Sequence, residues 1–322
     1  MLVKMTDGSA YHPEPPIQLG ILDLVPQAEG AAAEQAVREA ARLAQTAEAC
    51  GYTRYWAAEH HDLPGLACAA PEVLLAHIGA VTRSIKLGTG ALLLPHYSPL
   101  KVAETFNLLS ALYPGRIELG IGRAPGGPAH ASMALSGNFL QRVYGMEQSV
   151  KALTGLLDGT YTYEGEPVQA KPAAAASPAL WMLGTGSRSA GYAAQSGCGF
   201  VFGAFMSDED PAAALAAYRQ AFVPSSRLPG PRTILAVSVL CAESAGEAAE
   251  LARAGRPGLS DEAAPPRRQH EILGTAGEAV SRLRDWQSRY RNDEFLIMTP
   301  SWNYEARQRS VRLLAECVKA LS

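Results

Sequence analysis

Reactive residue types gather where three short apolar runs end, between residues 54 and 123. Two stretches with helical spacing, 71–83 and 99–113, separate these runs. The three ends read Glu59-His60-His61, Gly90-Ala91 and Gly122-Arg123. Strands alternating with helices, with reactive residues at the trailing strand ends, are typical of an α/β protein whose site lies at the carboxyl edge of a parallel sheet.

The pair of histidines suggests either a metal centre or acid/base chemistry. Neighbouring residues on a strand point to opposite faces, so His60 and His61 cannot easily bind one ion together. A single histidine at a strand end, poised near neutral pH, is instead a candidate general acid/base. The alternative for Glu59 or His61 is a purely structural role, which we expect for at least one of them.

The segment that begins at Gly120 reads G-I-G-R-A-P and superficially resembles a dinucleotide-binding turn. The third glycine of that fingerprint would fall at Pro125, so we reject this interpretation. Arg123 carries a fork of donors that suits a phosphate or a carboxylate. A glycine turn without a ligand remains an equal alternative on the residues alone.

A second small-residue segment, G-T-G-S-R-S over 184–189, lies between an expected strand and a helix start. Backbone amides at a helix N-terminus favour an anion. The alternative is simple capping of the helix by Ser187 or Ser189. Because Arg123 follows the preceding strand, both segments could reach one phosphate.

The elements that must position these residues alternate along the whole chain. Expected strands lie at 17–22, 55–58, 85–94, 117–121, 180–183, 199–202, 233–241 and 295–298, and expected helices at 31–50, 71–83, 99–113, 139–157, 188–196, 211–222, 245–253, 275–290 and 304–321. Eight such units in 322 residues predict a single (β/α)8 TIM barrel, with insertions after strands 4 and 7. A doubly wound sheet with a cap domain is the alternative.

Three segments depart from this alternation. After the fourth strand we expect a loop over 126–137 and a small hairpin within 158–178. Residues 256–274 are polar and hold three prolines, which favours a lid or a disordered loop. Residues 1–16 read as a polar lead-in, so the barrel is expected over 17–322.

Composition excludes several classes of protein. The net charge of −3 leaves no basic footprint for nucleic acid, and no apolar run is long enough for a bilayer span. The 5 cysteines are scattered and form no C-x-x-C pair, which favours a reducing, cytoplasmic location.

No lysine falls at a strand end and no G-x-S-x-G occurs, so the site has a phosphate cradle and a histidine but no evident nucleophile. Such a site suits a phosphorylated organic cofactor.

Several ordered motifs resemble those of the bacterial luciferase-like family of flavin-dependent monooxygenases, which are (β/α)8 barrels. They read Y-W-A-A-E-H-H over 55–61, L-G-T-G-A-L-L-L-P over 87–95, A-E-T-F-N-L-L over 103–109, G-R-I-E-L-G-I-G-R over 115–123, G-T-G-S-R-S over 184–189 and I-L-G-T-A-G-E-A-V over 272–280.

The resemblance implies a role for each candidate residue. His60 corresponds to the acid/base beside the flavin, and Gly90-Ala91 to a non-proline cis peptide beneath its ring. Arg123 corresponds to the arginine that binds the FMN phosphate. The residues that complete the phosphate cradle are Gly184, Thr185, Gly186, Ser187 and Ser189. The resemblance also implies that 256–274 is a mobile active-site loop and that the helices at 71–83 and 99–113 form a homodimer interface.

The implied activity is oxygenation of a small organic substrate by reduced FMN and O2. Since the chain has no nicotinamide fingerprint, we expect a separate flavin reductase. Two alternatives stay open: a deazaflavin-dependent dehydrogenase or reductase of the same superfamily, and a flavin-binding protein without turnover. The sequence does not identify the substrate.

Overall fold

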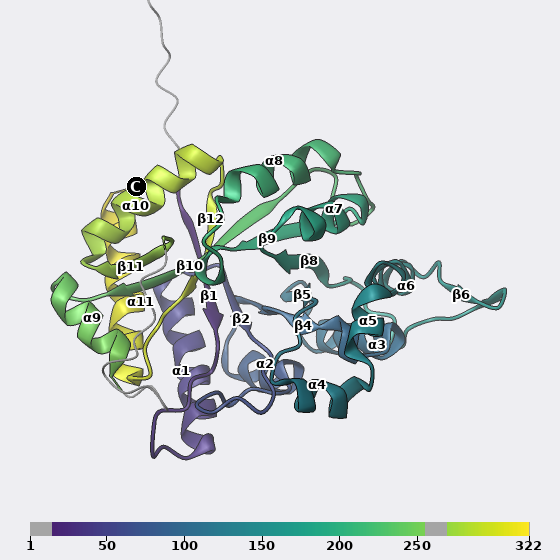
Figure 1. Ribbon diagram of the computed structural model, residues 1–322, viewed down its shortest axis with the longest axis horizontal. Coiled ribbons are helices and arrows are strands. Elements are labelled where there is room, and N and C mark those ends of the chain that lie inside the picture. The colour runs from purple at the N-terminus through teal and green to yellow at the C-terminus, as the bar shows by residue number, and fades with distance from the viewer. Residues whose placement is uncertain (1–14, 255–268, 322) are drawn as a thin grey trace, which may run out of the picture.

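Eight parallel strands close into a barrel, which confirms the predicted fold (Figure 1). A computed structural model describes residues 15–254 and 269–321. Each barrel strand pairs with the next in the chain, and the ring closes where the last strand pairs with the first. The barrel strands are β1 (Gln18–Asp23), β2 (Arg54–Ala57), β3 (Lys86–Thr89), β5 (Ile117–Gly122), β8 (Ala179–Gly184), β9 (Gly199–Gly203), β10 (Thr233–Cys241) and β12 (Glu294–Met298).

An outer ring of helices covers the barrel (Figure 1). These helices are α1 (Ala33–Cys50), α2 (Pro71–Val81), α3 (Pro99–Leu112), α6 (Met146–Asp158), α7 (Ser187–Gln195), α8 (Pro211–Ala221), α10 (Ala276–Tyr290) and α11 (Tyr304–Ala320). Three of them begin at a proline, which loses no amide hydrogen bond in the first turn. Gly51 ends α1 with a φ of 85°, a conformation that favours glycine.

The insertion after β5 differs from the prediction. The expected loop over 126–137 contains a helix, α4 (Ala129–Ser136), and the expected long helix over 139–157 is split into α5 (Phe139–Tyr144) and α6. Asn138 caps α5 through a hydrogen bond from the Gln141 amide, and Gly145 separates α5 from α6. Pro128 and the alanines after it suit a helix start, a signal that the glycines on either side obscured.

Further short elements complete the two insertions. The expected hairpin is confirmed as β6 (Thr162–Tyr163) and β7 (Glu166–Pro167), which project beyond α6 (Figure 1). After β10 come α9 (Ala245–Arg253) and β11 (Glu271–Gly274), which pairs with the outer half of β10. The prediction of a loop over 256–274 is therefore wrong for its last four residues, which form β11. Residues 1–14 and 255–268 lie outside the described residues. Shorter elements are β4 (Leu92–Leu93), η1 (Leu94–His96) and η2 (Ala204–Met206).

The core has two layers because side chains alternate along each strand. One set packs between the strands and the outer helices. The other fills the inside of the barrel and consists of Leu22, Trp56, Trp181, Val201, Ile234, Ala236 and Leu296. Within the described ranges, no helix has the length and apolar character needed to cross a membrane.

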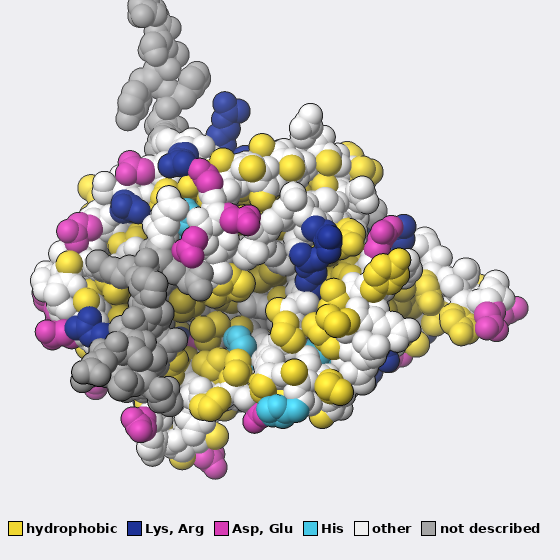
Figure 2. Space-filling view, in the orientation of Figure 1, with side chains coloured by type: hydrophobic (Ala, Val, Ile, Leu, Met, Phe, Trp, Pro, Cys, Tyr) yellow, Lys and Arg dark blue, Asp and Glu magenta, His cyan; other side chains and the backbone are white. Residues whose placement is uncertain are grey.

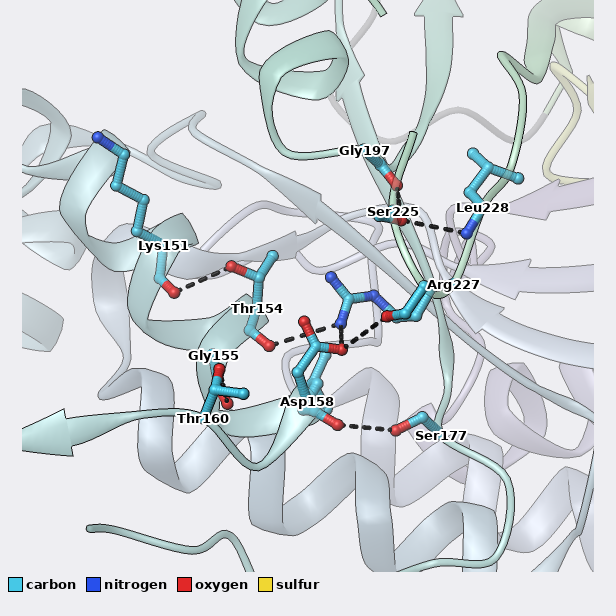
Figure 3. Close-up of polar contacts among 12 residues, drawn as sticks. Lys151, Thr154, Gly155, Asp158, Thr160, Ser177, Gly197, Ser225, Arg227 and Leu228 are labelled. Carbon is cyan, nitrogen blue, oxygen red and sulfur yellow. Dashed lines mark hydrogen bonds and ion pairs between the residues drawn. The ribbon is translucent and has the colours of Figure 1, made fainter. Parts of the chain in front are cut away.

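An ion pair joins the connections that enter β8, β9 and β10 (Figure 3). The Arg227 guanidinium pairs with Asp158 at the C-terminal end of α6 and also donates to the Thr154 carbonyl oxygen at 3.5 Å. Beside it, the Ser225 hydroxyl donates to the Gly197 carbonyl oxygen at 2.7 Å. These contacts hold together the turns at the amino-terminal strand ends, on the opposite side from the strand-end motifs.

Replacement of Arg227 by alanine is expected to lower the free energy of unfolding by about 1–2 kcal/mol. The physical reason is that the partly shielded Asp158 carboxylate and the Thr154 carbonyl oxygen lose their donor. Urea denaturation would measure the change. Alanine at Arg38, an exposed position on α1, is the control and should change stability by less than about 0.5 kcal/mol. Equal stabilities of the two variants would contradict a stabilising role for the pair.

Candidate functional site

The predicted site residues come together at one rim of the barrel. His60 follows β2, Gly90-Ala91 follows β3 and Arg123 follows β5, while the segment 184–186 begins at the last residue of β8. These four strands are consecutive neighbours in the barrel, so their carboxyl ends lie side by side. The rim is therefore a continuous arc that one ligand can span.

His60 lies half-buried at this rim with a free ring nitrogen. Its backbone amide donates to the Cys68 carbonyl oxygen at 2.9 Å. Its Nδ1 is buried and has no hydrogen-bond partner among residues 15–254 and 269–321. Burial lowers the pKa of His60 to about 4, and the neighbouring His61 adds to the shift. The imidazole is therefore neutral at pH 7, and the expectation of a histidine poised near neutrality is wrong.

Glu59 and His61 take the structural role that was expected for at least one of them. The Glu59 carboxylate is fully buried and accepts hydrogen bonds from the Leu93 amide at 2.9 Å and the Tyr97 hydroxyl at 2.8 Å. His61 Nε2 lies 2.8 Å from the same carboxylate. This network ties the end of β2 to β4 and η1, and so braces the backbone on both sides of His60. Tyr97 was missed by sequence reasoning, because no local pattern marks it as a partner of Glu59.

The side chains around His60 and His61 bear on the metal alternative. Among the described residues, no three His, Cys, Asp or Glu side chains converge in a way that could hold an ion. Glu59 engages His61 rather than leaving it free, and His61 packs against the His96 ring at 6.0 Å between centroids.

The end of β3 lies between the ends of β2 and β5, which are followed by His60 and Arg123. The Gly90-Ala91 peptide is cis, as predicted from the resemblance. A Cβ atom on Gly90 would clash with Leu22, and one on Gly122 would lie 2.9 Å from the Ala91 Cβ. Only glycine fits at these positions. We call Gly90, Ala91 and Gly122 the glycine floor, because this surface carries almost no side chains.

Two groups beside the glycine floor can hold an anion. Arg123 is half-buried and makes no hydrogen bond or ion pair with any described residue. Helix α7 begins after Gly186, whose backbone is extended, and no side chain caps it. Capping by Ser187 or Ser189, the alternative for this segment, is therefore not what the structure shows. The first amides of α7 remain available.

The hydroxyl side chains of this segment differ in exposure. Ser189 is buried, and it packs so closely on Gly184 that a Cβ atom there would clash with it. Thr185 is half-buried and Ser187 is exposed. A Cβ atom on Gly186 would meet nothing within 4 Å, so the space in front of the helix is open. Thr185 and Ser187 are thus placed to reach a group bound there.

The rim also carries apolar side chains. Leu183, Phe205 and Met298 pack on the inner core at the ends of β8, η2 and β12. Figure 2 shows that this face of the molecule is hollowed near its centre, with hydrophobic side chains and a histidine around the hollow. Sequence reasoning missed this wall, because its residues come from strands far apart in the chain. Together, the unpaired Arg123, the uncapped helix and the glycine floor fit a cofactor with a phosphate and a flat ring.

Comparison with known proteins agrees with this geometry. The family model described as luciferase-like monooxygenase matches residues 17–300. The N-acetyl-S-alkylcysteine monooxygenase of Bacillus subtilis is 34% identical over 334 residues, which cover 94% of this chain and 99% of that protein. A luciferase-like monooxygenase of Escherichia coli is 38% identical over 229 residues, covering 71% and 68%. The crystal structure of apo-MsnO8 superposes with a TM-score of 0.84 at 32% identity, covering 94% and 98%.

Proposed function

Because this chain belongs to the luciferase-like monooxygenase family of flavin-dependent enzymes, we propose that it uses reduced FMN and O2 to oxygenate a small organic substrate. One observation carries the proposal. His60 Nδ1, the Arg123 guanidinium and the first amides of α7 are polar groups without partners in the described structure, and they follow β2, β5 and β8, the strands that lie beside or near β3 and the glycine floor. Buried or half-buried polar groups without partners are costly unless a ligand binds them.

The phosphate of FMN would lie between Arg123 and the N-terminus of α7. Arginine offers a planar fork of donors, and the helix amides add a favourable dipole. Gly184, Thr185, Gly186, Ser187 and Ser189 would complete this cradle. The glycine floor, Gly90, Ala91 and Gly122, would lie beneath the flavin ring. Reduced FMN supplies the electrons that activate O2.

His60 would hold or move a proton beside the ring. Its neutral imidazole can accept a proton at one nitrogen and donate from the other, and its buried Nδ1 has no partner among the described residues. The apolar wall of Leu183, Phe205 and Met298 would exclude water from the reacting atoms. The same wall favours a substrate with an apolar body.

Supply of reduced flavin requires a second protein in this proposal. The chain has no G-x-G-x-x-G turn for a nicotinamide cofactor, and in the segment that begins at Gly120, Pro125 stands where the third glycine would fall. A separate flavin reductase would therefore reduce FMN before the oxygenase binds it.

Chemically reduced FMN provides the direct test, because it removes the need for a reductase. The protein would be mixed with reduced FMN, ¹⁸O2 and a panel of thioethers, aldehydes and aromatic compounds, and products would be analysed by mass spectrometry. One ¹⁸O atom in a product supports the proposal. Reduction of a deazaflavin by an alcohol, without affinity for FMN, selects the dehydrogenase alternative. Tight flavin binding with no product from any substrate class selects the carrier.

We also propose that the protein forms a homodimer through α2 and α3. These helices expose a stripe of large apolar side chains: Val73, Val81, Leu108 and Leu112. Two small residues of these helices serve the chain itself, since Ala103 is buried and Gly79 packs against the Tyr113 ring. The exposed stripe, rather than those small residues, supports the interface.

Replacement of both Leu108 and Leu112 by glutamate is expected to turn the dimer into a monomer, because two charges would be buried without partners. Sedimentation velocity at micromolar concentration would show the change. Leu140, which is 77% exposed on α5 and outside the stripe, is the control, and L140E should leave the mass unchanged. A monomeric wild-type protein, or a dimer that survives the double change, would rule out this interface.

A further inference from the structure

Trp56 occupies the centre of the barrel directly beneath the rim. Its side chain is fully buried, and its Nε1 donates to Glu118 Oε2 at 2.7 Å. Its ring lies 5.9 Å from the Trp181 ring in an edge-to-face arrangement. The indole is therefore held by one directed hydrogen bond, one aromatic contact and the Arg54 guanidinium, which lies 6.0 Å from the ring.

Glu118 is itself held by charge. Arg54 Nε lies 3.3 Å from its carboxylate and Lys86 Nζ lies 3.9 Å away. Arg54 also pairs with Glu294 at 2.7 Å, so the carboxylate belongs to a buried ion-pair network. Breaking such a network at one member is costly, because the remaining charge stays buried. Glu118 is thus a rigid acceptor for the indole.

The indole packs against the backbone that leads into the glycine floor. A Cβ atom on Gly88 would lie 2.5 Å from Trp56 Nε1. A Cβ atom on Gly90 would lie 3.3 Å from Trp56 Cε3, and one on Gly120 would lie 3.2 Å from Cζ3. The ring therefore packs from inside the barrel against glycines at β3 and β5. Because these glycines have no side chains, a movement of the indole acts directly on the backbone.

We propose that Trp56, held by Glu118, is a positioning residue. It fixes the position of the backbone of the glycine floor and so controls how FMN binds. The inference rests on the proposed function, since it assigns the floor to the flavin ring. Close packing transmits a displacement of the indole to Gly90 and to Gly122, which lies two residues after Gly120. The effect reaches the cofactor through the backbone, without contact between Trp56 and the substrate.

Trp181 provides a matched control inside the same barrel. It is equally large and almost as buried, but its Nε1 has no hydrogen-bond partner within the described ranges. It stacks under the guanidinium groups of Arg54 and Arg232, at 5.3 and 5.1 Å. Phenylalanine at position 181 therefore removes a similar volume without removing a directed hydrogen bond.

The experiment compares W56F with W181F, and E118A with E118Q. We measure the FMN dissociation constant, the visible circular dichroism of bound FMN and the melting temperature. W56F and E118A are expected to weaken FMN binding by about tenfold, the equivalent of one lost hydrogen bond, and to alter the dichroism. W181F and E118Q should keep FMN affinity and dichroism within about twofold of wild type, since a glutamine still accepts from the indole. Both Glu118 variants should melt at a lower temperature, because Arg54 loses one charge partner.

A purely structural role for Trp56 would lower the melting temperature of W56F and W181F alike and leave flavin affinity and dichroism unchanged, which overturns the inference. If W56F does not fold, E118A against E118Q decides the question, because both retain the ring. Failure of the wild-type protein to bind FMN would instead overturn the proposed function, and this inference with it.

Discussion

Replacement of Arg123 by alanine is expected to weaken FMN binding by about 1.5–3 kcal/mol, or roughly 10- to 150-fold. The physical reason is the loss of a charge-assisted hydrogen bond to the phosphate from a guanidinium that has no described protein partner to retain it. Fluorescence titration of the flavin would give the dissociation constants. Because Arg123 is free in the unliganded protein, the melting temperature should change little.

Riboflavin sharpens this test, since it has the ring of FMN but no phosphate. Its affinity should be the same for the wild-type protein and R123A. Alanine at Arg142, an exposed residue of α5, is the matched control for loss of a positive charge near the rim. Equal losses for FMN and riboflavin would show that Arg123 supports the pocket rather than the phosphate, and an unchanged FMN constant would remove it from the site.

Replacement of His60 by glutamine is expected to lower turnover by about 10²- to 10⁴-fold, the usual contribution of a positioned acid or base. FMN affinity should stay close to the wild-type value, because the phosphate cradle lies on other strands. The turnover of H60Q would be measured with reduced FMN, O2 and a substrate that the wild-type protein oxygenates, and compared with the turnover of H130Q. His130 is exposed and pairs with Asp62 on the surface, so its loss should matter little.

The pH dependence tests the protonation state of His60. Burial lowers its pKa to about 4, so the imidazole is neutral throughout the range from pH 5 to 8. If the neutral form is required in the free enzyme, kcat/KM should fall only as the pH drops toward about 4. An acid limb near 6.5 that is present in wild type and absent in H60Q would contradict this assignment.

Periodicity and strand-end chemistry in the sequence were enough to predict the barrel. Apolar runs of strand length alternate with helical spacing, and each pattern depends on local contacts that a linear sequence displays. The motifs at 55–61, 87–95 and 115–123 were equally visible, because each one lies on a single strand and the loop after it. The family, the fold and the cis peptide at Gly90-Ala91 were therefore accessible before the structure.

Only the tertiary structure decided which of these residues are free to bind a ligand. Glu59 and His60 are adjacent in sequence. The Glu59 carboxylate accepts hydrogen bonds from the Tyr97 hydroxyl and the Leu93 amide, whereas Nδ1 of His60 has no partner among the described residues. Burial, which depends on residues far away in the chain, also moved the pKa of His60 away from neutrality. The support of Trp56 beneath the glycine floor depends on Glu118, 62 positions further along. Local patterns place residues at strand ends, but hydrogen-bond partners and solvent exposure arise when distant segments pack together.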